Sequence, residues 1–79
     1  MTQIPYADSK GLLSVEVELQ HPAKVFLVDS TNYRKMNARQ DYNYYGGYYT
    51  RTPVTISVHG YGRWYLIVHG DGQYNYRFY

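Results

Sequence analysis

The sequence predicts an all-β protein, either a compact antiparallel β-sandwich or a partly closed barrel of about six strands. Several short segments alternate apolar and polar residues, turn signals rich in glycine, proline and aspartate separate them, and no segment has the i, i+3, i+4, i+7 pattern of a helix. The chain has 79 residues and no cysteine. We therefore expect one domain, residues 1–79, with a thin core and no disulfide.

The first two strands are expected on the two sides of a proline break. Residues 12–19 place Leu13, Val15, Val17 and Leu19 on one face and polar residues on the other. After His21-Pro22, residues 24–28 are almost continuously apolar, which is typical of a central strand. We expect a hairpin to join the two strands.

The next segment, residues 29–41, is mostly polar and predicts a long connection. Tyr33 and Met36 are three residues apart, which fits a single helical turn with both side chains on one side. The candidate N-caps are Asp29, Ser30 and Thr31. Long connections in compact domains are often functional.

A tyrosine-rich run follows at residues 42–49, interrupted by Gly46-Gly47. The glycine pair is compatible with a bulged strand or with a tight hairpin turn. We favour a bulged or bent strand.

Three further strands are expected in the last third of the chain. Residues 54–59 and 63–68 have strand patterns and are separated by Gly60-Tyr61-Gly62. Asp71-Gly72 is a two-residue hairpin signal leading into a last strand at residues 73–79.

Charge and composition argue against several functional classes. The net charge of +2 is too small to predict nucleic acid binding by itself, and no signal peptide or long apolar run is visible, so we expect a cytoplasmic protein without membrane association. His59 and His69 should lie at opposite ends of a strand, which disfavours a shared metal ion. No hydroxyl, base and carboxylate are forced together, so we expect no catalytic residues and no cofactor.

The most suggestive feature is the surplus of tyrosine, twelve residues in all, interleaved with arginines. A small sandwich cannot bury so many phenols, and exposed rings beside guanidinium groups suit a ligand that is both aromatic and anionic. We therefore expect a non-catalytic binding module, working as a homo-oligomer, that captures a nucleotide-type small molecule. The alternatives are a purely structural protein-interaction module and a carbohydrate-binding domain. The candidate ligand-binding residues are Tyr33, Arg34, Arg39, Tyr44, Tyr45, Tyr48, Arg51 and Trp64.

A family resemblance adds to this interpretation. The segments that carry it are Val25 to Tyr33, Tyr44-Tyr45-Gly46-Gly47, Thr52-Pro53 and Gly62-Arg63-Trp64-Tyr65. In their order and spacing, over roughly residues 12–68, the chain resembles the small bacterial family called domain of unknown function eighteen eighty-three. The resemblance implies a compact β-sandwich, alone or joined to a TIR-domain effector, without established catalytic residues. In a bacterial or phage immunity context, such a module would sense or sequester a nucleotide signal.

Overall fold

The computed structural model describes residues 4–70 and 73–79. It contains one antiparallel sheet of five strands in the order β3-β2-β4-β1-β5 and one short helix. The elements are β1 (Tyr6–Leu19), β2 (Ala23–Asp29), α1 (Ser30–Asn37), β3 (Tyr45–Tyr49), β4 (Val54–His69) and β5 (Tyr74–Phe78). The predicted all-β class is confirmed, and the sheet is not closed into a barrel.

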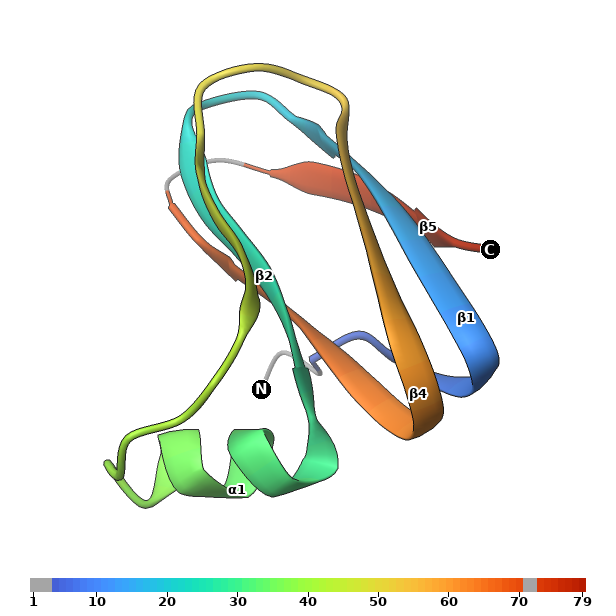
Figure 1. Cartoon of the computed structure of the whole chain (residues 1–79). Coiled ribbons are helices and arrows are strands. Elements are labelled where there is room, and N and C mark those ends of the chain that lie inside the picture. Colours follow the sequence, from blue (N-terminus) through green and yellow to red (C-terminus); the bar gives the residue numbers. More distant parts are fainter. Residues whose placement is uncertain (1–3, 71–72) are drawn as a thin grey trace.

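The two longest strands, β1 and β4, share a sharp bend that folds the sheet over on itself (Figure 1). Gly11 lies opposite Gly60 in their register, and φ is 135° and 134° at these two residues. Gly62 follows with φ of 115°. Residues with side chains rarely adopt such backbone angles, so the glycines make the bend possible.

The bend divides the sheet into two halves. The covered half comprises β3, β2, residues 61–69 of β4 and residues 6–10 of β1. The open half comprises residues 54–59 of β4, residues 12–19 of β1, and β5.

The inner core lies between the two halves. Leu13, Val15 and Val17 point inward as their alternation predicts. Across the core, the covered half contributes Val25, Leu27 and Leu66. Full burial of each such aliphatic side chain contributes about 1.5–3 kcal/mol to folding.

A second, smaller core lies on the outer face of the covered half. Phe26, Val28 and Ile67 are buried there, and Tyr33 and Met36 of α1 pack against them. β2 is therefore buried on both faces, which explains its nearly continuous apolar sequence and confirms that it is a central strand.

The polar connection contains a helix, α1, that is longer than the single turn expected. Asp29 is its N-cap: the carboxylate Oδ1 accepts a hydrogen bond from the backbone N–H of Asn32 at 2.8 Å. Tyr33 and Met36 lie on the side facing the sheet, as predicted. The expectation that no segment is a real helix is wrong, because a good cap and two anchoring side chains stabilise α1 without a long apolar stripe.

The glycine pair lies inside the edge strand β3, so the strand interpretation is confirmed and the hairpin alternative is not. The register with β2 is uninterrupted, with Gly46 opposite Phe26 and Gly47 opposite Val25, and it contains no bulge. A Cβ atom at Gly46 would clash with the Val25 carbonyl oxygen. Gly46 thus allows β3 to approach β2 closely.

Three of the expected strand connections are wrong. β1 and β2 do not form a hairpin, because β4 lies between them. Residues 60–62 do not separate two strands, because they form the bend within β4. β5 pairs with β1 and not with β4, while the Asp71-Gly72 turn itself lies outside the described residues. Alternation shows which face of a strand is buried, but it does not identify the neighbouring strand.

Candidate functional site

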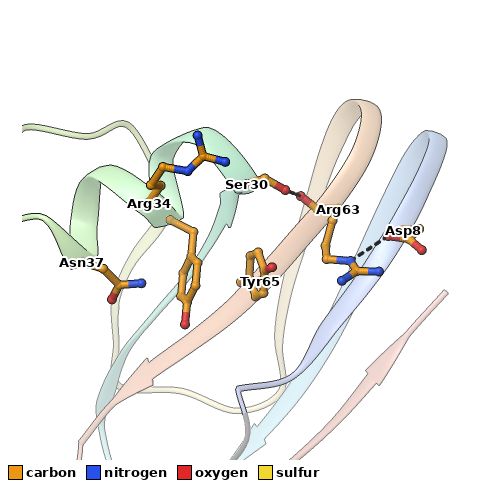
Figure 2. A pocket seen from close by; sticks show the side chains of 7 residues that line it. Asp8, Ser30, Arg34, Asn37, Arg63 and Tyr65 are labelled. Atoms are coloured by element: carbon orange, nitrogen blue, oxygen red, sulfur yellow. Dashed lines mark hydrogen bonds and ion pairs between the residues drawn. The ribbon is translucent and has the colours of Figure 1, made fainter.

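A groove of about 630 Å³ runs between α1 and the bend of β4, and we call it the α1–β4 groove (Figure 2). It is open to solvent, and two arginines, two tyrosines and three smaller polar residues line it. These residues are Asp8, Ser30, Tyr33, Arg34, Asn37, Arg63 and Tyr65.

The aromatic wall of the groove is a stacked pair of tyrosines. The Tyr33 and Tyr65 rings have centroids 4.0 Å apart and planes inclined by 15°. Tyr6 continues the row, with its ring centroid 6.0 Å from that of Tyr65. Tyr33 and Tyr65 are half-buried, so the pair fixes α1 to the sheet and also presents ring surface to the groove.

Arg63 is held in place at one end of the groove. Its Nε donates a hydrogen bond to Oδ1 of Asp8 at 3.1 Å, and its guanidinium lies 4.3 Å from the centroid of the Tyr6 ring. The pKa of Arg63 is raised, mainly by the hydrogen bond to Asp8, so this residue stays charged. The ion pair is largely solvent-exposed and its main role is to orient the guanidinium.

Arg34 lies on α1 at the other side of the groove, with Tyr65 between the two arginines in Figure 2. It is exposed and makes no ion pair with residues 4–70 or 73–79. Ser30 connects the two sides, since its Oγ donates a 3.4 Å hydrogen bond to the Arg63 carbonyl. Within the described residues, the groove therefore contains one guanidinium that is oriented by an ion pair and one that makes none.

Guanidinium, phenol and small polar groups make up the chemistry of the groove. The groove contains no histidine, and its one carboxylate, Asp8, is occupied by Arg63. Both Arg34 and Arg63 line the groove, and guanidinium groups bind anions through charge-assisted hydrogen bonds.

The structure separates the residues predicted to form one binding surface. Tyr33 and Arg34 line the α1–β4 groove. Arg39 follows α1 with a left-handed backbone, φ 59°, and does not line the groove. Arg51 lies in a separate depression with His21 and Thr50.

The other predicted residues surround β3. Tyr44 and Tyr48 are exposed, and the Lys24 Nζ lies 4.8 Å from the centroid of the Tyr44 ring. Tyr45 meets Trp64 edge-on with centroids 5.7 Å apart. Trp64 is buried in the inner core, contrary to the expectation of an exposed binding residue.

Sequence reasoning missed five groove residues: Asp8, Ser30, Asn37, Arg63 and Tyr65. The sequence did contain a signal for Arg63, because it is one of the arginines interleaved with tyrosines and lies between Tyr61 and Tyr65. The sequence contained no such signal for Asp8, since this residue reaches the groove only because the strand register places it opposite Arg63.

Metal and membrane sites were also considered. Within residues 4–70 and 73–79, no three histidine, cysteine, aspartate or glutamate side chains group closely enough to hold a metal ion. No helix in this part of the chain is long and apolar enough to cross a membrane.

Fold and groove together define a small antiparallel β domain with one helix-covered half and a basic, tyrosine-lined groove. The model of the DUF1883 family, described as a domain of unknown function, matches residues 8–77. The chain therefore belongs to the DUF1883 family. No curated protein and no solved structure matches the chain significantly.

Proposed function

We propose that this protein is a non-catalytic binding module whose α1–β4 groove captures an anionic ligand with an aromatic ring, of the nucleotide type. The observation that carries the proposal is that Arg34, which makes no ion pair with residues 4–70 or 73–79, lines the same groove as the oriented guanidinium of Arg63. Anionic groups such as phosphates are bound well by arginine because its planar donors match their oxygens.

The tyrosine pair supports the aromatic part of the ligand. Tyr33 and Tyr65 stack on each other and expose part of their rings in the same groove as the arginines. Stacking on tyrosine tolerates different bases, since every base has a π face. The Asn37 amide and the Ser30 hydroxyl add neutral hydrogen-bonding groups.

A carbohydrate is a weaker candidate for this groove. Sugar hydroxyls are neutral and would leave the Arg34 charge without a counterion. The groove's carboxylate, on Asp8, is already engaged by Arg63. The charge of the groove thus favours an anion over a neutral sugar.

Titration calorimetry with AMP, ADP, cyclic AMP and a cyclic dinucleotide tests the proposal. At least one probe is expected to bind, and Arg34→Gln is expected to weaken binding tenfold or more, because a hydrogen bond to a charged group contributes about 1.5–3 kcal/mol. Lys35→Gln is the matched control: Lys35 is the next residue of α1, is exposed and carries the same charge, but does not line the groove. It should change the affinity less than twofold.

Two outcomes contradict the proposal. One is the absence of binding heat for every probe. The other is an equal loss of affinity in Arg34→Gln and Lys35→Gln, which would indicate a general attraction to positive charge without a specific groove.

A further inference from the structure

The open half ends in a strand, β5, whose outer edge pairs with no described residue. β5 is the last strand in the sheet order, with β1 on its inner side. Native proteins commonly protect such edges with lysine, proline or a bulge. β5 has the sequence Tyr-Asn-Tyr-Arg-Phe, with none of these, and its one charged side chain, on Arg77, lies 3.5 Å from Glu16 of the neighbouring strand.

The hydrogen-bond pattern shows which backbone groups of β5 point outward. Tyr79 and Ser14 exchange both of their backbone hydrogen bonds, each at 2.9 Å. In an antiparallel ladder, inward and outward residues alternate, so Asn75 and Arg77 also direct their N–H and C=O groups toward β1. Tyr74, Tyr76 and Phe78 direct theirs to the free edge.

The side chains of these outward-bonding residues form an aromatic row on the inner face. The ring centroids of Tyr74 and Tyr76 are 6.2 Å apart, and those of Tyr76 and Phe78 are 5.7 Å apart. Tyr76, in the middle, is 48% exposed, whereas Tyr74 and Phe78 are partly buried against the inner core. The middle ring of the row is therefore the one left uncovered at the free edge.

We infer that β5 pairs antiparallel with β5 of a second copy of this chain, with Tyr76 opposite the partner's Tyr76. This register makes Tyr74 and the partner's Phe78 a hydrogen-bonded pair, so every outward-directed backbone group of β5 finds a partner. A two-fold axis through Tyr76 joins the two sheets into one, with both aromatic rows on the same face.

Charge complementarity selects this register over its neighbours. On the outer face, Arg77 lies opposite the partner's Asn75, and the next residue across the sheet is the partner's Glu18. A shift by two residues in one direction would place two Arg77 side chains opposite each other, which is unfavourable. A shift in the other direction would leave Phe78 without a strand partner.

The other edge strand, β3, is a weaker candidate for self-pairing. Its centre is Gly46-Gly47, and glycine weakens strands because it has no side chain to pack and loses more backbone entropy. The aromatic residues of β5 favour strand pairing instead.

Sedimentation equilibrium over a wide range of concentrations tests the inference, with Tyr76→Lys as the disrupting variant. Two like charges would meet at the two-fold axis, so Tyr76→Lys is expected to be monomeric where the natural chain is dimeric. Tyr61→Lys is the matched control, since Tyr61 is 84% exposed and belongs to the bend of β4. This variant should remain dimeric.

A mixed sample separates loss of pairing from loss of folding. Tyr76→Lys mixed with Tyr76→Glu is expected to recover the dimer, because opposite charges then meet at the axis. A monomeric natural chain, a dimeric Tyr76→Lys variant, or a mixture that stays monomeric would each overturn the inference. None of these outcomes depends on the α1–β4 groove, so the proposed function is tested separately.

Discussion

The two halves of the folded sheet differ in what covers them. The centre of the covered half, β2 and the adjacent part of β4, is buried on both faces, by the inner core on one side and by α1 on the other. The open half has an apolar inner face, while its outer face carries alternating polar residues such as Thr55, Ser57 and His59. One sheet thus has a three-layered part and a part open to solvent.

This difference assigns separate roles to the two halves. The covered half contains the second core, and the α1–β4 groove lies where α1 meets the bend of β4. The open half contributes less burial and ends in the free edge of β5. The proposed ligand capture and the inferred self-association would use opposite parts of one small sheet, so substitutions in each half should have different consequences.

The largest expected effect comes from removing the ring at the centre of the covered half. Phe26 is fully buried beneath α1, so Phe26→Ala should lower the free energy of unfolding by about 3–5 kcal/mol. Thr55→Ala, on the exposed face of the open half, should cost less than about 1 kcal/mol. Urea unfolding followed by circular dichroism measures both. Similar losses in the two variants would contradict the difference between the halves.

The second prediction concerns the edge of the covered half. Gly46→Ala should lower the free energy of unfolding by about 2 kcal/mol or more, because the residue has φ of 144° and the new Cβ would clash with the β2 backbone. Gly47→Ala is the control: no atom lies within 4 Å of a Cβ at that position, and the change should be within about 1 kcal/mol. Thermal unfolding of the two variants compares them directly. Equal stability would argue against the close approach of β3 to β2.

A smaller effect is expected from the cap that positions the groove. Asp29→Ala removes the carboxylate that accepts hydrogen bonds from the backbone and side chain of Asn32, and it should cost about 0.5–2 kcal/mol. Hydrogen exchange should accelerate in α1 more than in β5. Uniform acceleration throughout the chain would show that α1 is not an independently capped element.

The smallest effect is a pH dependence in the open half. Burial raises the pKa of Tyr74 above its ordinary value of 10.0, and the neighbouring Tyr76 raises it further. The folded state therefore favours the neutral phenol: this stabilisation is complete below pH 10 and is lost as the pH rises through the higher folded-state pKa. Tyr74→Phe should consequently lose less stability than the natural chain between neutral and strongly alkaline pH. A parallel alkaline decline in both proteins would contradict this assignment.

Much of the fold could be predicted from local patterns. The alternation at Leu13 to Leu19 identified the inner face of β1, and the apolar run at residues 24–28 identified a strand buried on both sides. The polar segment after Asp29 contained a cap and two anchoring residues, which predicted a helical turn there but not the full length of α1. These features depend on residues close together in the sequence.

The strand order and most of the groove could not be predicted in this way. Pairing of β1 with β4 and β5 depends on contacts between distant segments, and the turn signal at residues 60–62 is equally compatible with a hairpin and with a bend inside one strand. For the same reason the groove could not be predicted, because Asp8 lies beside Arg63 only through the register of β1 and β4. Tyr33 and Arg34 were found because both lie on the local element α1.

The central claim is that the covered half binds an anionic aromatic ligand in the α1–β4 groove. A titration of the ¹⁵N-labelled protein with ADP, followed by NMR, tests it most directly. The account predicts saturable shifts of the Arg34 and Arg63 side-chain signals and of the Ser30 and Asn37 amides, with no change in β5. Shifts confined to β5, or no saturable shift around Arg34 at any ADP concentration, would contradict it.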